Sequence, residues 1–381
     1  MAQITGKTIY VLGAGSSFHT GAPLLRDFLV KSRLLREEKK DLKYKDSFDR
    51  VFKWIDSLRG ASYYVEFDLD NLEHIFSLAD MLKQLGSEEG GKYFSDLRYV
   101  VMETLDRCQI RWKKGNFIPD PLYHNFIIGF QKLNEERRQV LTQSGGEYEN
   151  DVIITFNYDV MLDYSIRFRT SLTPDYCFET KTHPDSLKVL KLHGSTNWAY
   201  CPSCNNKLQV VTPSPVADGY HVSPFLEDEQ WFDFKMVTDV LSKTSCRECN
   251  KHDTLEPLII PPTWSKAMKD SPFAKVWASA VEEIQKAFQI VVIAYSMPTT
   301  DTFFQYLLTL GLASNPKLHR VVVIDKDGSE DFKERYKRVF SRSLVDRGRL
   351  KFLTGVTFKD FIVKNYMELI VNQVEWNDDD E

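Results

Sequence analysis

The sequence predicts an α/β protein with a Rossmann-like, mostly parallel and doubly wound sheet, a helical insertion and a small cysteine-rich module. Three observations lead to this prediction. Short apolar runs recur along the 381-residue chain and end in small or polar residues, as strands covered on both faces do. A long stretch with helical spacing separates the first two runs, and four of the 6 cysteines form two C-x-x-C pairs.

The composition is that of a globular protein. Its 49 basic and 54 acidic residues give a net charge of -5, which argues against nucleic-acid binding by the chain as a whole. Hydrophobic residues at 43% and aromatic residues at 13% exclude a disordered chain. The apolar runs are far shorter than the roughly 20 residues of a membrane span, and the N-terminus lacks the charged start of a secretory signal. We therefore expect a cytoplasmic protein with no membrane contact and no sequence-specific nucleic-acid binding.

Six apolar runs are expected to form parallel strands. They are Ile9–Leu12, Val152–Phe156, Leu187–Leu192, Leu258–Ile260, Ile290–Ala294 and Val321–Ile324. The third run, LKVLKL, contains two lysines and is expected at the edge of the sheet. Ligands of such sheets bind beyond the carboxyl ends of the strands. The polar residues that follow these runs are therefore the candidate site residues.

The organisation along the chain follows from these runs. Residues 1–36 are expected to form the first βα unit of the core and 37–150 a helical insertion with charged clusters. Residues 151–200 continue the core, 201–256 form the cysteine module, and 257–381 complete the core and the C-terminal region. The insertion would carry partner contacts or cover the pocket. The alternative is that its charge runs are simply solvated helix faces.

A glycine-rich turn follows the first run. Gly13 and Gly15 stand directly after it, and a helix with Pro23 near its start is expected next. Such a turn brings backbone N–H groups close to a pyrophosphate at a helix N-terminus. The dinucleotide-binding pattern is incomplete, because Phe18 occupies the position of the third glycine. A tight turn without a ligand is the alternative.

The spacing of these motifs resembles the sirtuin family. GAGSSFHTGAPLLR resembles the sirtuin opening signature, TFNYD resembles its T-Q-N-x-D motif, and LHGS resembles its catalytic H-G pair. AYSMP and VID resemble the strand ends that contact the rest of NAD. The resemblance implies an NAD pocket. Its matched positions are Gly13, Ala14, Gly15, Ser17, Arg26, Asn157, Asp159, Ser296 and Asp325.

Several positions depart from the sirtuin deacylases. Leu24 and Leu25 replace an Asp-Phe pair, and Phe156 replaces the glutamine of T-Q-N. The segment that grips an acyl-lysine peptide in sirtuins is replaced by 259–266, IIPPTWSK. With these features the chain resembles the divergent sirtuin-like domains of bacterial antiphage defence systems. That resemblance implies NAD⁺ hydrolysis, with NAD as the substrate.

The chemistry of this reaction suits three of the residues. Cleavage of the N-glycosidic bond of NAD⁺ passes through an oxocarbenium-like sugar, as in glycoside hydrolysis. We expect His193 to act as base, Asn157 to orient water or ribose, and Asp159 to bind the carboxamide and stabilise positive charge. The alternatives are structural: a buried histidine, an Asx turn at Asn157 and an N-cap at Asp159.

The far end of the nucleotide has weaker candidates. Ser296 would donate to a phosphate, and Asp325 would accept from the adenosine ribose. For Asp325 the alternative is a strand-end turn. Asp301 starts the next helix and is expected to be no more than a cap. Arg26 would meet a phosphate or, in the alternative, a surface carboxylate.

The two C-x-x-C pairs predict a structural zinc site. Cys201, Cys204, Cys246 and Cys249 form a Cys₄ set whose halves are separated by 246 − 204 − 1 = 41 residues. Four thiolates leave no open position for catalysis. The alternatives are a redox disulfide, disfavoured in a reducing cytosol, or unliganded thiols.

The leading functional hypothesis is an NAD⁺ glycohydrolase that releases nicotinamide and gives ADP-ribose or a cyclic form. The resemblance implies an antiphage effector that depletes NAD⁺ when triggered. It also implies a homo-oligomer and a regulatory partner, such as a HerA-type ATPase, an Argonaute-like protein or a phage protein. The alternatives are an NAD-dependent protein deacylase and a non-enzymatic sensor of NAD or ADP-ribose.

Overall fold

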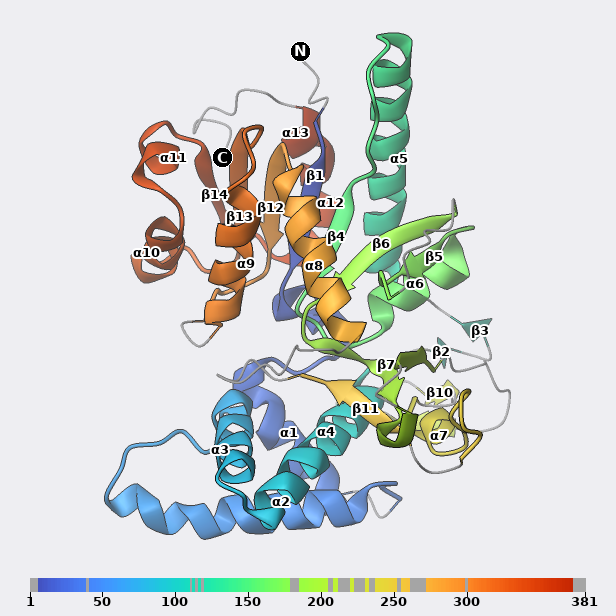
Figure 1. Cartoon of the computed structure of the whole chain (residues 1–381), viewed down its shortest axis with the longest axis vertical. Helices are drawn as coiled ribbons and strands as arrows, with labels where there is room; N and C mark the ends of the chain where they lie inside the picture. Colours follow the sequence, from blue (N-terminus) through green and yellow to red (C-terminus); the bar gives the residue numbers. More distant parts are fainter. Residues whose placement is uncertain are drawn as a thin grey trace.

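A seven-stranded parallel sheet forms the centre of the molecule (Figure 1). The computed structural model describes residues 6–38, 41–109, 112–113, 116–117, 120–178, 185–204, 208–211, 220–222, 230–232, 237–251, 255–260, 272–298 and 301–372. In sheet order its strands are β14 (Leu350–Thr354), β13 (Arg320–Asp325), β12 (Gln289–Ile293), β1 (Thr8–Leu12), β4 (Val152–Thr155), β6 (Ser186–Lys191) and β5 (Thr173–Asp175). The prediction of a doubly wound, mostly parallel α/β sheet is confirmed.

The strand order reverses beside β1. After β1 the chain adds β4, β5 and β6 on one side, and it then returns to add β12, β13 and β14 on the other. Every residue of β1, β12 and β13 is buried, because these strands are covered on both faces. The switch point of the sheet therefore lies between β1 and β12, where such folds bind their ligands.

Helices cover both faces of the sheet. One face carries α8 (Pro272–Gln285) and α9 (Thr302–Leu312), which pack against each other. The other face carries α5 (Pro121–Gln143), α6 (Met161–Arg169), α12 (Phe358–Val363) and α13 (Tyr366–Asn372) (Figure 1). Helices α10 (Glu330–Val339) and α11 (Arg342–Asp346) connect β13 to β14.

A separate helical layer lies below the carboxyl edge of the sheet (Figure 1). It contains α1 (Leu25–Glu38), α2 (Lys45–Leu58), α3 (Leu72–Gln84) and α4 (Glu88–Cys108). Helices α1 and α4 each contact the other three, and the four helices contribute to a shared apolar core. Asn71 and Ser87 cap α3 and α4 by accepting from backbone N–H groups in the first turn. The layer thus includes α1, whereas α5 packs on the sheet.

A three-stranded antiparallel sheet carries the cysteine-rich segment. Its order is β11 (Glu256–Ile259), β7 (Gly194–Tyr200) and β8 (Leu208–Val210). The short pairs β2 (Trp112–Lys113) with β3 (Asn116–Phe117), and β9 (Tyr220–Val222) with β10 (Gln230–Phe232), lie beside it, as does α7 (Val237–Leu241). The expectation that Leu258–Ile260 forms a parallel strand of the main sheet is therefore wrong, because β11 pairs antiparallel with β7.

The predicted sheet edge is also corrected. Strand β6, the LKVLKL run, pairs with β4 on one side and with β5 on the other, so the short β5 is the edge. The lysines of β6 mark internal ion pairs rather than an open edge: Lys188 contacts Glu283, and Lys191 contacts Asp163. The opposite edge strand, β14, has no counterpart among the predicted runs.

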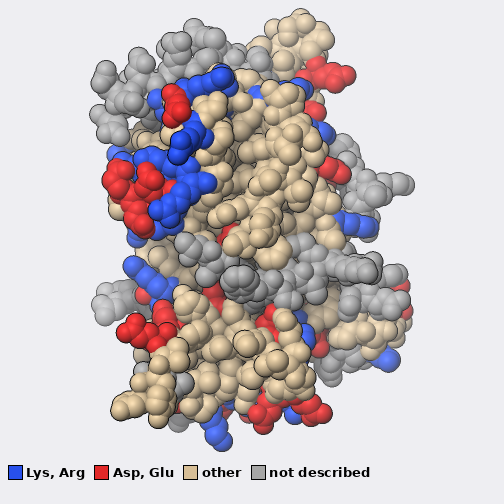
Figure 2. Space-filling model, turned by 60° about the vertical axis from the view of Figure 1, so that its left-hand side comes forward, with Lys and Arg blue, Asp and Glu red and all other residues tan. Residues whose placement is uncertain are grey.

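Charged side chains lie in mixed groups on the face drawn in Figure 2. On α10, for example, Lys333 pairs with Glu330, and Arg335 pairs with Asp331. Within the described residues, the helices fall short of the length and hydrophobicity that crossing a bilayer requires.

Candidate functional site

Three candidate residues follow three neighbouring strands. Gly13 comes directly after β1, Asn157 two residues after β4, and His193 two residues after β6. These strands are parallel and adjacent in the order β1, β4, β6. Because neighbouring strands are about 4.8 Å apart, the three residues form a row at the carboxyl edge. This edge of the sheet faces the helical layer (Figure 1).

The glycine turn is packed against the end of β12. The Gly13 N–H donates to the carbonyl of Ile293 at 3.0 Å, and the Gly15 N–H donates to that of Ala294 at 3.2 Å. A Cβ at Gly13 would overlap with the Ala294 carbonyl oxygen, so this close approach requires glycine. The two glycines therefore pack tightly against the end of β12, and both of their N–H groups donate to carbonyl oxygens of the protein.

The segment after the glycines differs from the expectation. Two single-turn 3₁₀ helices, η1 (Ala14–Ser16) and η2 (Phe18–Thr20), come first, and α1 begins only at Leu25. The N-terminus of α1 is thus separated from the glycine turn, because the chain first turns through Gly21 at a φ of 91°.

Asn157 holds this turn in place with its side-chain amide. Its Nδ2 is 3.0 Å from the carbonyl oxygen of Gly13 and from the Oγ atoms of Ser16 and Ser17. The side chain is 8% exposed, and its Oδ1 has no hydrogen-bond partner among the described residues. A buried acceptor without a partner costs free energy, so Oδ1 is available to a ligand hydroxyl.

Tyr123 is a contact to this turn that the sequence did not indicate. It lies in the first turn of α5, and its hydroxyl is 2.7 Å from Ser17 Oγ and 3.2 Å from Ser16 Oγ. Burial raises the pKa of Tyr123 well above its usual value, so the hydroxyl stays protonated. No local pattern around Tyr123 predicts the contact, because it joins segments more than 100 residues apart.

Asp159 lies one residue before the N-cap of α6, which is Val160. Its Oδ1 accepts from the backbone N–H of Met161 at 3.0 Å, so its side chain closes an Asx-type turn ahead of the helix and is not the N-cap. Its carbonyl oxygen accepts from Lys191 Nζ at 2.5 Å. A contact of Asp159 with the carboxamide of NAD stays a prediction.

His193 lies at the junction of the two sheets. Its carbonyl oxygen accepts from the Ile260 N–H at 2.8 Å, and Gly194 follows at a φ of 82°, where an added Cβ would overlap with the Leu258 carbonyl. The imidazole is 6% exposed, and its centre is 5.1 Å from the ring of Phe156. Its Nε2 lies 3.6 Å from Asp301 Oδ2. The histidine is therefore fixed by its backbone and faces a carboxylate.

The remaining NAD-pocket candidates are spread along the same edge. Ser296 is exposed, and its carbonyl oxygen accepts from Arg335 Nε at 3.2 Å. Asp325 ends β13, and its Oδ1 accepts from the Asp327 N–H at 2.9 Å, which is a strand-end turn. Burial raises the pKa of Asp325. Arg26 is exposed on α1 and lies 3.3 Å from the neighbouring Asp27, so its phosphate contact stays a prediction.

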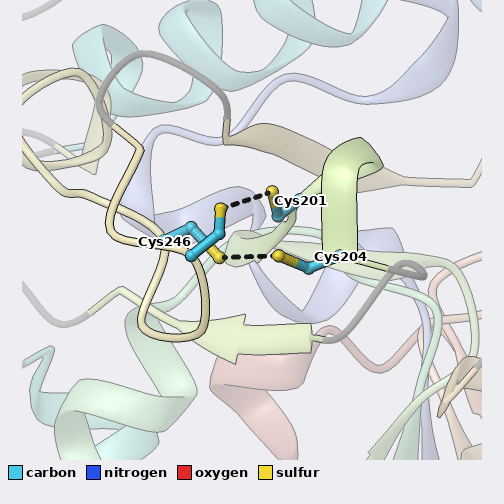
Figure 3. Close-up of side chains that lie close together, drawn as sticks. Cys201, Cys204 and Cys246 are labelled. Carbon is cyan, nitrogen blue, oxygen red and sulfur yellow. Dashed lines mark hydrogen bonds between the residues drawn. The ribbon is translucent and has the colours of Figure 1, made fainter.

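The four predicted metal ligands come together. The Sγ atoms of Cys201, Cys204, Cys246 and Cys249 all lie within 4.8 Å of one another. The distances Cys201–Cys249 and Cys204–Cys246 are both 3.8 Å, and three of these side chains are labelled in Figure 3. Tetrahedral zinc with bonds of about 2.3 Å places its sulfurs about 3.8 Å apart, so the cluster fits a structural zinc ion.

A cavity of about 500 Å³ lies at the opposite, amino end of β1, β4 and β6. Its charged side chains pair with one another: Glu283 contacts Lys7, and it accepts from Lys188 at 2.7 Å. None of the predicted NAD-pocket residues lines this cavity. We therefore place the candidate site at the carboxyl edge.

The fold and the site define a doubly wound α/β protein with polar side chains at its switch point and a Cys₄ cluster. No protein-family model matches the sequence, and no curated protein matches it significantly. The chain is similar to a solved Sir2 homologue–NAD complex, with 14% identity, a TM-score of 0.41 and coverage of 97% of this chain and 93% of that one. It is also similar to a Sir2 protein bound to acetylated peptide, with 15% identity, a TM-score of 0.38 and coverage of 96% and 94%.

A third similar structure is Sir2Tm bound to a propionylated peptide, with 14% identity, a TM-score of 0.38 and coverage of 96% and 94%. All three are Sir2 proteins, the family that the motifs resemble.

Proposed function

We propose that the protein is an NAD⁺ glycohydrolase. The observation that carries the proposal is the row of Gly13, Asn157 and His193 at the carboxyl edge, after three adjacent strands of which the first, β1, borders the switch point. A doubly wound sheet binds a dinucleotide at this place. Asn157 offers a buried acceptor without a partner among the described residues, and His193 offers an imidazole that can accept and donate a proton.

The reaction breaks the bond between the nicotinamide nitrogen and the ribose C1′. The bonding electrons leave with nicotinamide, which departs as a neutral molecule, and positive charge develops on the sugar. Asn157 Oδ1 accepts a hydrogen bond from a ribose hydroxyl or from the attacking water. As the water oxygen bonds to C1′, His193 takes its proton, and ADP-ribose is formed. Attack by an atom of the nucleotide itself would give a cyclic product.

Aromatic side chains support this chemistry by excluding water behind His193. Phe156 stacks on Tyr295 with ring centres 4.4 Å apart and contacts Phe304 edge-on at 5.1 Å. Phe156 stands where sirtuin deacylases carry glutamine. The exclusion of water by these aromatic side chains strengthens the electrostatic interactions of the histidine with the reacting groups.

Unrestrained NAD⁺ hydrolysis would drain the cell, so we propose that the protein is a triggered antiphage effector in the cytoplasm. The motif resemblance supports this role, together with a homo-oligomer and a regulatory partner such as a HerA-type ATPase, an Argonaute-like protein or a phage protein. The helical layer is the candidate contact region, because it exposes large apolar side chains. Tyr63 and Tyr64, in the segment that connects α2 to α3, are 86% and 83% exposed, and Leu85, at the end of α3, is 72% exposed.

An NAD-dependent protein deacylase would use the same nicotinamide-releasing step. The choice between the two depends on whether an acyl-lysine peptide or water reaches the sugar. The replaced peptide-gripping segment favours water, but 261–271 lies outside the described residues. Ile259 and Ile260, which precede it, are described: Ile259 ends β11, and Ile260 bonds to His193.

The test is nicotinamide release from NAD⁺ by the purified full chain, alone and with the products of neighbouring genes, with and without an acylated peptide. We expect peptide-independent release that falls at least about 100-fold in His193→Ala and Asn157→Ala. His319→Ala is the matched control, since His319 lies at the amino edge beside Phe288. Release coupled to peptide deacylation would select the deacylase. No release in any assembly, or full activity in His193→Ala, would contradict the mechanism.

A further inference from the structure

Asp301 occupies a helix-capping position without capping. It is the N-cap residue of α9, where an aspartate usually accepts from the N–H groups of the first turn. Its side chain makes no such hydrogen bond, and the residue is only 1% exposed. The expectation that Asp301 is merely a cap is therefore wrong, because its carboxylate makes no hydrogen bond to the first turn of α9.

The carboxylate is directed toward the candidate site. Its Oδ2 accepts from the hydroxyl of Tyr295 at 2.8 Å and lies 3.6 Å from Nε2 of His193. Tyr295 is fixed in turn, because its ring stacks on Phe156 and its carbonyl oxygen accepts from the hydroxyl of Tyr336 at 2.5 Å. Asp301 is thus held in one orientation by a residue that follows β12, while it faces a histidine that follows β6.

Asp301 supplies the negative charge beside the imidazole of His193, because the tyrosines around it stay protonated. Burial, and after it the negative charge of Asp301, raises the pKa of Tyr295 well above its usual value, so Tyr295 remains a donor at neutral pH. Tyr158, on the loop after β4, faces the same imidazole with ring centres 6.0 Å apart, and burial likewise keeps it protonated by raising its pKa. From α3, the charge of Glu73 acts on both tyrosines.

We propose that Asp301 is a positioning residue that orients the imidazole of His193 and stabilises its protonated form during the reaction. The inference rests on the proposed function, in which His193 takes a proton from the attacking water. At 3.6 Å the two groups are within ion-pair range, and protonation of the imidazole would draw them closer. The interaction gains strength because both side chains are buried.

The negative charge of Asp301 determines the direction of its effect on the protonation of His193. A carboxylate beside an imidazole favours the protonated imidazolium over the neutral ring. Asp301→Asn removes the charge and retains an oxygen that can accept from Tyr295. We expect the midpoint of the His193 titration to move to lower pH in this variant. We also expect kcat to fall by at least about tenfold, with a smaller change in KM.

The experiment is an NMR titration of the full chain labelled at histidine with ¹³C and ¹⁵N, from pH 5 to 9. The His193 signal is assigned by its loss in His193→Gln. Asp301→Asn should move the titration of this signal to lower pH, and Asp301→Glu should restore part of the shift. Asp120→Asn is the matched control, because Asp120 faces another histidine, His19, at 2.6 Å and asparagine preserves its helix cap.

The titration needs no turnover, so its outcome is independent of the proposed activity. An unchanged His193 titration in Asp301→Asn overturns the inference, even where NAD⁺ hydrolysis is observed. A shifted titration in a protein without hydrolysis sustains the pairing and contradicts only the proposed function. Should Asp301→Asn fail to fold, Asp301→Ser takes its place, because it also removes the charge and is small enough for the site.

Discussion

The buried ion pair between Lys191 and Asp163 gives a sharp prediction about the support of the site. Lys191 Nζ lies 3.0 Å from Asp163 Oδ2 and 2.5 Å from the carbonyl oxygen of Asp159, and Lys191 is 1% exposed. Lys191→Met preserves the length of the side chain but removes its charge. It would leave the carboxylate of Asp163 buried beside Tyr176, whose hydroxyl also donates to it.

The expected loss of stability is about 3–5 kcal/mol, the cost of removing one partner of a buried pair. The low end is favoured, because methionine fills the volume and Tyr176 continues to hydrogen-bond Asp163. The double variant Lys191→Met/Asp163→Asn should lose less than the sum of the single changes, by at least about 1 kcal/mol, since no buried charge remains unpaired. Loss of the bond to Asp159 should also lower nicotinamide release.

Urea unfolding followed by tryptophan fluorescence measures these free energies. Lys188→Met is the matched control on the same strand: its side chain is 33% exposed, and its partner Glu283 retains Lys7. We expect the control to lose no more than about 1 kcal/mol. If Lys191→Met were as stable as Lys188→Met, the interpretation that Lys191 of β6 forms a stabilising buried ion pair with Asp163 would be refuted.

Three further predictions address other parts of the molecule. Metal analysis of the purified chain should find zinc, Cys201→Ser should lose it together with stability, and Cys177→Ser should retain it; a metal-free, equally stable wild type would contradict the site. Gly13→Ala should destabilise the fold, because its Cβ meets the end of β12, whereas Gly91→Ala in α4, with no atom within 4 Å, should be neutral or stabilising in thermal unfolding. Burial acts to raise the pKa of Glu283, but the nearby lysines outweigh it and lower the pKa. The stabilisation by Glu283 is therefore complete at neutral pH and lost on acidification below the usual value of about 4.3, and Glu283→Gln should flatten the acid loss of unfolding free energy.

The row of site residues could be predicted from the sequence because each member directly follows a buried apolar run. The rule that parallel strands end at the same edge of a sheet is enough to predict that Gly13, Asn157 and His193 lie together. The spacing of the two C-x-x-C pairs is enough to predict the cysteine cluster. The edge strand could not be predicted in this way. A lysine in an apolar run looks exposed until its partner is known, and Lys191 finds Asp163 on a helix of another segment.

Other features depend on contacts between distant segments. The run Leu258–Ile260 is too short to distinguish a parallel from an antiparallel strand, because apolarity reports burial and not the neighbour. Tyr123 reaches the glycine turn from α5, and Asp301 faces His193 across the sheet. Nothing near these residues in the chain distinguishes a capping aspartate or a core tyrosine from a member of the site.

Strand β7 connects the candidate site at His193 to the cysteine cluster. It begins directly after His193 and ends directly before Cys201, and its neighbour β11 leads to Ile260, whose N–H bonds to the His193 carbonyl. The backbone of the histidine is therefore held by the parallel sheet on one side and by the cysteine-bearing sheet on the other. A metal bound to the four thiolates would stabilise the far end of β7 and, through it, the position of the imidazole. In this way a closed Cys₄ site with no catalytic position of its own would contribute to the geometry of the candidate site.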